Sequence, residues 1–259
     1  MFGPDLLQGK AAFVTGGGTG IGLAAAKMFY ELGANVIIVG RREEVLQQAA
    51  YHLDPTGARV LDVVCDIRDP GMVESAVAVA REQFGSIRIL VNNAGGQFPA
   101  PAEAITPNGF EAVVRNNLLG TWNVTREVAI RSMIPHGGGV VVNVIANVAR
   151  GFPGMVHTGA ARAGVENMTR TLAIEWIGHG IRVNAVAPGI IRTEGVSNYP
   201  EDLRMRAVRN TPSKRFGTVE EVARSIVYLA SDVSSFVNGV TLYVDGGASL
   251  WGETWPIPS

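Results

Sequence analysis

The sequence predicts a doubly wound α/β fold, with a mainly parallel sheet that is covered by helices on both faces. Short runs rich in Val and Ile, apolar throughout, alternate with longer amphipathic stretches along the chain. Strands without a polar face are typical of sheets that are buried on both sides. The regular alternation of strand and helix favours right-handed crossovers between parallel strands.

The predicted strands are Ala11–Thr15, Asn35–Val39, Arg59–Val64, Ile87–Val91, Gly139–Val144, Ile181–Val186 and Thr241–Val244. Helices are expected near residues 20–32, 42–53, 71–84, 107–133, 157–178 and 218–230. The segment 192–217 breaks this alternation and is rich in Arg, Pro and Asn. We expect it to be an excursion that covers a ligand site and contains short helices. No repeat or linker divides the chain, so residues 1–259 are predicted to form a single domain.

The composition excludes several classes of protein. The 259 residues include 22 Lys and Arg against 23 Asp and Glu, a net charge of −1, whereas nucleic-acid binding needs a basic face. The single cysteine, Cys65, allows neither a disulfide nor a thiolate metal site within the chain. No apolar run approaches the roughly 18 residues of a membrane span. The first residues lack a secretory pattern and WPIPS does not match the peroxisomal tripeptide, so we expect a cytoplasmic protein.

A glycine-rich turn joins the first predicted strand to the first helix, with the sequence TGGGTGIG over Thr15–Gly22. Such a turn lets the backbone approach a pyrophosphate, and the helix N-terminus offers free N–H groups and partial positive charge. The pattern T-G-x-x-x-G-x-G fits, whereas G-x-G-x-x-G fails at its last position. The candidate cofactor-binding residues here are Gly16, Thr19, Gly20 and Ile21. The alternative is a glycine-rich turn without chemical meaning.

Two arginines follow the second predicted strand, where a chain that selects NAD places an acid for the ribose hydroxyls. Arginine can hold a 2′-phosphate through charge-assisted hydrogen bonds worth about 1.5–3 kcal/mol each. We therefore predict NADPH as the cofactor, with Arg41 rather than Arg42 as the preferred contact. The alternative is a solvated pair that opens a helix.

Further candidates follow the third and fourth predicted strands, where an open α/β sheet binds its ligand. Asp66 could accept a hydrogen bond from an adenine amino group, or could equally cap a turn, and Ile67 follows it. Asn93, Ala94 and Gly95 would let the backbone reach the cofactor, while asparagine amides at this point can tie adjacent strands together.

These features occur in one order along the chain: the glycine turn, Asn92–Gly95, Asn117–Gly120, Pro188-Gly189 and Asp245–Gly247. In this the chain resembles the short-chain dehydrogenase/reductases over nearly its whole length. The resemblance implies an NADP-binding Rossmann domain with a seven-stranded sheet, and a homotetramer whose subunit contacts could use the helices near 107–133 and 157–178. It also implies that Pro188, Gly189, the backbone of Ile191 and the Thr193 hydroxyl hold the nicotinamide carboxamide; the alternative is a Pro-Gly turn only.

The family's active site combines Asn, Ser, Tyr and Lys, and this chain departs from it. Carried over by position, Asn117 matches, whereas Ala146, Thr158 and Arg162 stand in the places of Ser, Tyr and Lys. A threonine hydroxyl is a far weaker acid than a phenol, and arginine stays charged. Ordinary alcohol and ketone chemistry is therefore disfavoured, although Thr158 and Arg162 still share one helical face.

The stretch HTGAARAGV, residues 157–165, resembles the branch of the family that contains 2,4-dienoyl-CoA reductases and the peroxisomal trans-2-enoyl-CoA reductase. That resemblance implies NADPH-dependent reduction of a C=C bond conjugated to a CoA thioester, in fatty acid metabolism. The dienoyl reductases usually carry Lys in place of Arg162. The enoyl reductase carries Tyr in place of Glu166.

Such a reaction needs donors that stabilise negative charge on the thioester oxygen. We expect Thr158 to donate to that oxygen, Arg162 to supply positive charge and contact the nicotinamide ribose, and Asn117 to orient water or donors. His157 is a possible acid or a helix-start histidine without a chemical part, and Asn147 is a further amide candidate.

The acyl-CoA substrate suggests two further candidate regions. Phe98 and Tyr199 could line an acyl channel or could be packed inside the protein. The arginines of 192–217 could meet CoA phosphates or form a solvated face. Two other functions stay open: a carbonyl or alcohol oxidoreductase of the same fold, and an inactive NADPH-binding sensor.

Overall fold

The computed structural model describes residues 3–193 and 201–250. Within them, seven strands form one sheet in the order β3-β2-β1-β4-β5-β6-β7, and every neighbouring pair is parallel. The strands are β1 (Ala11–Thr15), β2 (Asn35–Gly40), β3 (Val60–Val64), β4 (Ile87–Asn92), β5 (Gly139–Val144), β6 (Ile181–Pro188) and β7 (Thr241–Val244). The predicted fold class is confirmed. The strand order reverses between β1 and β4, which creates a crevice at their carboxyl ends.

The helices are α1 (Gly20–Glu31), α2 (Glu43–Leu53), α3 (Pro70–Phe84), α4 (Pro107–Val114), α5 (Gly120–Val128), α6 (Val156–Glu175), α8 (Glu201–Asn210) and α9 (Val219–Ala230). The stretch predicted as one helix near 107–133 is continuous but irregular, because π-helical turns at Arg115–Leu119 and Ala129–Met133 flank α5. The helix expected to reach residue 178 ends at Glu175. A separate 3₁₀ turn, Ile177–His179, follows it.

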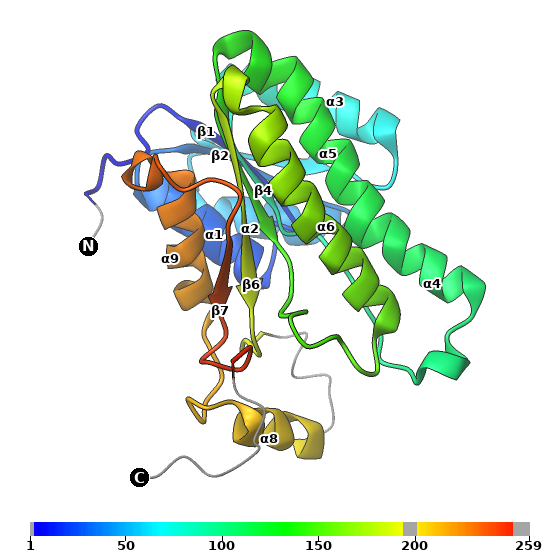
Figure 1. Cartoon of the computed structure of the whole chain (residues 1–259). Coiled ribbons are helices and arrows are strands. Elements are labelled where there is room, and N and C mark those ends of the chain that lie inside the picture. Colours follow the sequence, from blue (N-terminus) through cyan, green and yellow to red (C-terminus); the bar gives the residue numbers. More distant parts are fainter. Residues whose placement is uncertain (1–2, 194–200, 251–259) are drawn as a thin grey trace.

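The helices cover both faces of the sheet (Figure 1). On one face, α1, α2 and α9 pack against alternate strand residues such as Val14 and Ile38. On the other, α3, α5 and α6 pack against the residues in between, such as Phe13 and Ile37. Burying each such side chain stabilises the fold by about 1.5–3 kcal/mol. The absence of a polar strand face in the sequence follows from this double cover.

A ladder of buried polar side chains links the two central strands to the helices above them. Asn92 donates to Thr125 Oγ1 at 2.7 Å and to Asn143 Oδ1 at 2.8 Å, and Asn143 donates to Thr169 Oγ1 at 2.8 Å. Buried amides need such partners because an unpaired polar group in the interior is costly. The ladder fixes α5 and α6 relative to β4 and β5; helix α6 and the π-helical turn that precedes α5 carry the candidate catalytic side chains.

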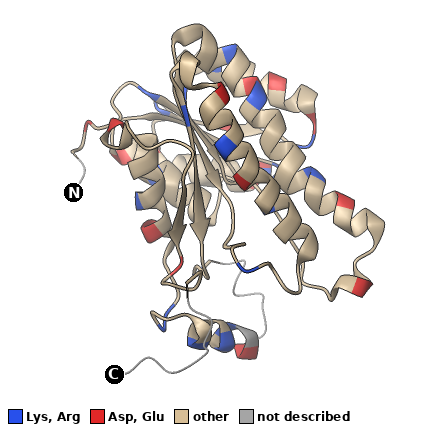
Figure 2. Cartoon of the chain, viewed as in Figure 1, with Lys and Arg blue, Asp and Glu red and all other residues tan. Residues whose placement is uncertain are grey.

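The excursion expected at 192–217 is closed at its base by a bridge between Ile191 and Gly217. In this bridge Arg192 N donates to Gly217 O at 2.9 Å, and Gly217 N donates to Ile190 O at 3.0 Å. Helix α8 lies beyond the carboxyl end of the sheet, and Figure 2 shows basic residues along it. Among the helices described, none has the length and apolar character needed to cross a membrane.

Candidate functional site

A cavity of about 510 Å³ opens at the carboxyl ends of β1 to β4. Most of the predicted cofactor residues line it: Gly16, Thr19, Gly20, Ile21, Arg41, Asp66, Ile67, Asn93, Ala94, Gly95 and Thr193. Four others do not, namely Arg162, Pro188, Gly189 and Ile191. We call this cavity the nucleotide pocket, because its shape and position are those in which open α/β sheets bind nucleotides.

The glycine turn owes its geometry to positions that only glycine tolerates. Gly16 and Gly20 have positive φ angles of 64° and 55°, which L side chains rarely adopt. A Cβ on Gly22 would collide with the carbonyl oxygen of Gly16 and lie 2.5 Å from Asn93 Nδ2. Thr19 precedes α1 without a side-chain capping bond, and no acid occupies the first helical turn. The N-terminus of α1 therefore presents N–H groups and positive potential to the pocket.

Asn93 holds the floor of the nucleotide pocket together. Its Nδ2 donates to Thr15 O at 3.1 Å and to Gly16 O at 3.2 Å. In return, Thr15 Oγ1 accepts hydrogen bonds from the backbone N–H groups of Asn93 and Ala94, each at 3.0 Å. The amide thus ties β1 to β4, as expected for an asparagine at this point of the sequence.

Asp66 both lines the nucleotide pocket and organises a turn. Its carboxylate accepts from Arg68 N at 3.0 Å and from Arg68 Nε at 2.9 Å, and the second oxygen also pairs with the guanidinium. The Arg68 guanidinium is the main cause that lowers the pKa of Asp66 to about 2, and the charge of Arg41 contributes to the same shift. Both alternatives raised for Asp66 are therefore compatible with its position.

Arg162 lies buried at the edge of the pocket, with 8% of its surface exposed. Its Nη1 donates to Val144 O at 2.9 Å, and its Nε has no hydrogen-bond partner among the described residues. The guanidinium reaches Gly95, since a Cβ there would collide with Arg162 Nη2. Burial lowers the pKa of Arg162 to about 10, which leaves the side chain cationic near neutral pH. The site therefore contains a partly desolvated positive charge next to a pocket residue.

Asn117 is fully buried in the π-helical turn before α5. Its Nδ2 donates to Gly96 O at 2.7 Å and to Val113 O at 2.9 Å, while its Oδ1 accepts from Gly96 N at 3.4 Å. Both amide hydrogens are thus engaged within the protein, and the expectation that Asn117 orients water or donors stays a prediction. The side chain fixes the loop after β4, where a Cβ on Gly95 would meet both Asn117 Oδ1 and the Arg162 guanidinium.

His157 and Thr158 lie in the first turn of α6, and both are fully buried. The Nδ1 atom of His157 accepts from Thr158 N at 2.8 Å and lies 3.3 Å from Thr158 Oγ1. The hydroxyl expected to donate to a substrate oxygen therefore lies within hydrogen-bond distance of the His157 ring. His157 Nε2 is buried and has no hydrogen-bond partner in the part of the chain that the structure describes, and leaving a buried donor unpaired costs about 1–3 kcal/mol.

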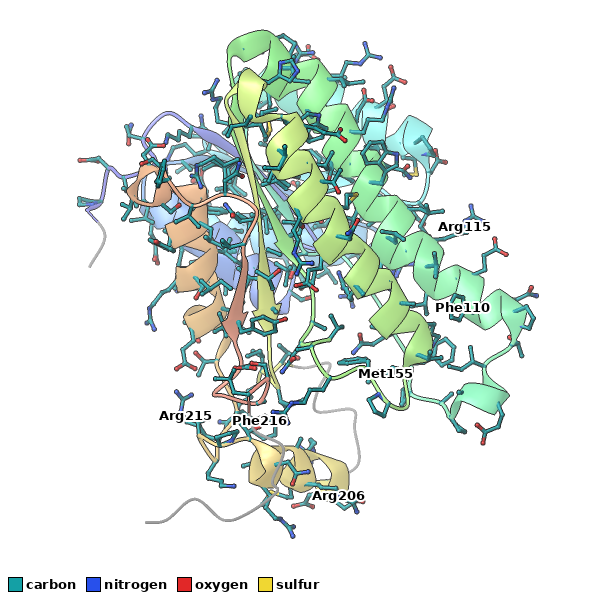
Figure 3. The ribbon with its side chains drawn as sticks, viewed as in Figure 1. Phe110, Arg115, Met155, Arg206, Arg215 and Phe216 are labelled. Atoms are coloured by element: carbon teal, nitrogen blue, oxygen red, sulfur yellow. The ribbon has the colours of Figure 1, made fainter. Side chains whose placement is uncertain are left out.

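Two phenylalanines enclose the His157 ring. Phe98 meets it edge to face with centroids 4.6 Å apart, and Phe110 of α4 lies 6.5 Å away. Figure 3 shows Phe110 and Met155 at the end of the molecule where α4 and α6 begin. Phe98 is 41% exposed and Phe110 is 38% exposed, so this cluster offers an apolar surface to a ligand. The other acyl-channel candidate, Tyr199, lies outside the described residues.

Several other residues considered in the sequence make contacts within the protein. Asn147 donates to Asp245 Oδ2 at 3.0 Å, and Glu166 accepts from Thr241 Oγ1 at 3.0 Å and pairs with Arg170. In the basic excursion, Arg215 pairs with Glu221. Part of the positive charge expected there is therefore neutralised within the protein.

Sequence reasoning did not name several residues of the nucleotide pocket and its border, among them Val45, Leu46, Asn116 and Arg68. Asn116 lines the pocket next to Gly96, and the doubled asparagine at 116–117 was the available signal. The Arg68 side chain binds the Asp66 carboxylate from two residues further along the chain. The D-x-R spacing was the signal that could have indicated this contact. Arg42 lines the pocket together with Arg41, so both arginines border the space that a 2′-phosphate would use.

The chain is similar to proteins of one family along almost its whole length. Residues 16–249 match the family described as Enoyl-(Acyl carrier protein) reductase. The chain is 44% identical over 253 residues to the peroxisomal 2,4-dienoyl-CoA reductase, (3E)-enoyl-CoA-producing, of Rattus norvegicus, covering 96% of this chain and 86% of that relative. It is 38% identical over 255 residues to the probable 2,4-dienoyl-CoA reductase, (2E)-enoyl-CoA-producing, of Bacillus subtilis (strain 168), covering 96% and 100%.

Solved structures agree with this relationship. The citronellol catabolism dehydrogenase AtuB of Pseudomonas aeruginosa PAO1 is 44% identical and superposes with a TM-score of 0.86, covering 96% of this chain and 98% of that one. A short-chain dehydrogenase from Bacillus anthracis str. 'Ames Ancestor' is 36% identical with a TM-score of 0.88, covering 96% and 100%. The fold, the pocket and these similarities agree, and this chain belongs to the short-chain dehydrogenase/reductase family.

Proposed function

We propose that this protein is an NADPH-dependent reductase of a C=C bond conjugated to a CoA thioester, in a 2,4-dienoyl-CoA or a trans-2-enoyl-CoA, and that it serves fatty acid metabolism. The observation that carries the proposal is its 44% identity, over 96% of the chain, to an enzyme named as a 2,4-dienoyl-CoA reductase. The buried Arg162 beside Gly95 supports it, because this reaction needs charge stabilisation more than an acidic phenol.

The residues of the nucleotide pocket fit NADPH. Gly22 leaves no room for a Cβ, so the backbone of the turn stays close to the N-terminus of α1, where phosphate groups bind. Arg41 borders the pocket beyond β2 and is suited to a 2′-phosphate. We assign the adenosine end to Asp66 and Ile67, and the ribose contact on the nicotinamide side to Arg162. When bound, the cofactor supplies a hydride to the substrate carbon at the far end of the conjugated system.

At the nicotinamide end, we retain Pro188, Gly189, Ile191 and Thr193 as carboxamide-binding residues. Thr193 supports this assignment, because its Cγ2 would lie 3.7 Å from a Cβ on Gly20 and it lines the pocket. The hydrogen bonds of the bridge between Ile191 and Gly217 use backbone groups of Ile190 and Arg192, so the N–H and C=O groups of Ile191 itself are not used in it.

The protein's own side chains then act on the thioester. Negative charge moves to the thioester oxygen as the far carbon is reduced, and we assign Arg162 to stabilise it. Its guanidinium is largely removed from solvent, and a preorganised donor in such a site contributes about 2.7–4 kcal/mol. Asn117 positions the Gly95–Gly96 backbone against Arg162, and Thr158 positions the ring of His157.

The test compares a 2,4-dienoyl-CoA, a trans-2-enoyl-CoA and a ketone side by side, with cofactor oxidation followed by absorbance. We expect one of the two conjugated thioesters to give the highest kcat/KM, and NADPH to be preferred over NADH. Faster turnover of the ketone would instead establish a carbonyl reductase. Tight NADPH binding without turnover of any of the three would favour the inactive sensor.

The assembly and the location of the protein are part of the same proposal. We propose a homotetramer, supported by exposed apolar side chains on and after α5 and α6, including Trp122, Ile130, Ile174 and Ile177. Light scattering of the purified protein would measure its mass directly. The cytoplasmic location expected from the sequence stays a prediction. Binding of CoA phosphates by the arginines of the excursion at 192–217 also stays a prediction.

A further inference from the structure

Helix α6 carries two buried N–H donors that have no partner in the described part of the chain: Arg162 Nε and His157 Nε2. Buried donors are almost always paired in folded proteins, so an unpaired one calls for an explanation. The proposed function already uses Arg162. The proposed function gives the unpaired Nε2 of His157 no role.

The hydrogen bonds fix which nitrogen of His157 carries the hydrogen. Thr158 N donates to Nδ1 at 2.8 Å, and a backbone N–H can only donate. Nδ1 is therefore the acceptor of the ring, and in the neutral imidazole the hydrogen resides on Nε2. Nε2 therefore carries a hydrogen that it can donate, and it has no acceptor among the described residues.

Phe98 covers the His157 ring, with centroids 4.6 Å apart. This phenylalanine belongs to an irregular loop that directly follows the two glycines fixed by Arg162 and Asn117. The loop thus runs from the buried cation to the buried imidazole. Phe98 is 41% exposed and lies in a loop without regular secondary structure, so its ring separates His157 from an acyl group that approaches from outside.

We propose that His157 donates Nε2–H to the thioester oxygen of the substrate, once the acyl group has displaced Phe98. The inference rests on the proposed function and adds a catalytic residue to it. As hydride from NADPH forms the new C–H bond at the far carbon, an electron pair moves along the conjugated system onto the thioester oxygen. His157 stabilises that charge through a hydrogen bond and transfers no proton. A proton from water then completes the reduction at carbon.

A purely structural role for His157 would depend on the other nitrogen. Nδ1 satisfies one of the N–H groups at the start of α6, which have no partner within the helix. The two roles can be separated, because asparagine places an acceptor near the position of Nδ1 but has no donor as far out as Nε2. Glutamine places an amide N–H near the position of Nε2 and lacks the acceptor near Nδ1. His157→Asn and His157→Gln are therefore a matched pair.

The experiment measures kcat and KM of both variants with the conjugated thioester, together with Tm and the Kd for NADPH. If His157 is the donor, His157→Asn lowers kcat by about 10²-fold, with Tm and NADPH affinity near those of the wild type. In that case the kcat of His157→Gln is much closer to that of the wild type than the kcat of His157→Asn is. Equal activity of His157→Asn and the wild type overturns the proposal, as does a larger loss in His157→Gln.

A binding measurement separates this inference from the proposed function. Calorimetry without cofactor compares a saturated acyl-CoA with the S-alkyl-CoA thioether that lacks the carbonyl oxygen. We expect the wild type to prefer the acyl-CoA and His157→Asn to lose that preference. Retention of the preference in His157→Asn contradicts the donor role. If the wild type reduces no conjugated thioester and binds neither ligand, the proposed function itself fails.

Discussion

The nucleotide pocket is lined largely by backbone and small side chains, whereas the region at the start of α6 is filled by larger side chains that bind one another. In the pocket, Gly16, Gly20 and Gly22 determine the shape. At the start of α6, His157, Thr158 and the Arg162 guanidinium are buried and either bonded locally or left unpaired. The shape of the nucleotide pocket depends on the path of the backbone. The chemistry at the start of α6 depends on which polar side chains lie close to one another.

This difference explains why one region keeps the family pattern and the other departs from it. Many side chains are compatible with a backbone pocket provided that its glycines remain. A reacting centre changes its chemistry as soon as one polar group is exchanged, because buried donors and charges act strongly on whatever they face. Four experiments test or sharpen the contrast, in order of decreasing expected effect.

Removing the cation at the reacting end should have the largest effect on rate. We expect Arg162→Met to lower kcat/KM for the conjugated thioester by about 10²–10³-fold. Its Tm should be unchanged or higher, because methionine replaces a buried, desolvated charge with an apolar group. Arg162→Lys is the control and should retain much of the rate, since it keeps the charge. An Arg162→Met variant as active as the wild type would exclude the assigned role.

Filling the glycine turn should damage the nucleotide pocket. A Cβ on Gly22 collides with the backbone of Gly16, and overpacking of this kind costs about 1–3 kcal/mol. We expect Gly22→Ala to weaken NADPH binding by about 10-fold or more and to lower Tm by several degrees, measured by calorimetry and thermal unfolding. Gly178→Ala is the control, because a Cβ there meets nothing within 4 Å. Unchanged NADPH affinity in Gly22→Ala would refute the steric argument.

Cofactor choice should depend on one of the few large side chains of the pocket. We expect Arg41→Ala to reduce the NADPH/NADH ratio of kcat/KM by about 10-fold, the value of one charge-assisted hydrogen bond. The comparison variant is Arg42→Ala, with a smaller expected change. A larger change in Arg42→Ala would transfer the 2′-phosphate contact to that residue, and no change in either would remove the basis for the NADPH assignment.

The smallest effect concerns the ion pair between Asp66 and Arg68. The pKa of Asp66 is lowered to about 2 from its ordinary 3.8, so the pair stabilises the folded state above pH 3.8 and loses this contribution as the pH falls toward 2. The two side chains are 23% and 39% exposed, which limits the effect to about 1 kcal/mol or less. The Tm difference between the wild type and Arg68→Ala should shrink from pH 6 to pH 3, and a constant difference would contradict this origin.

Local sequence predicted the elements well, because their signals are local. The apolar runs located every strand to within two residues at its ends, and Thr15–Gly22 indicated the turn that needs positive φ at Gly16 and Gly20. Covalent geometry and solvent exclusion determine these features without reference to distant residues. The π-helical turn that contains Asn117 escaped prediction, because the hydrophobic pattern continues through it.

Only the tertiary structure decided how the polar side chains of the site are used. Asn117 is tied to Gly96, 21 residues away, and Arg162 to Val144, 18 residues away. Because of those contacts, both hydrogens of the Asn117 amide are engaged, and the Arg162 guanidinium is buried with an Nε that no described residue accepts from. The sequence alone determined that the chain has a nucleotide-binding fold in which Thr158 and Arg162 replace the Tyr and Lys of the family. The availability of each hydrogen to a substrate depends on packing between distant segments, which local preferences do not specify.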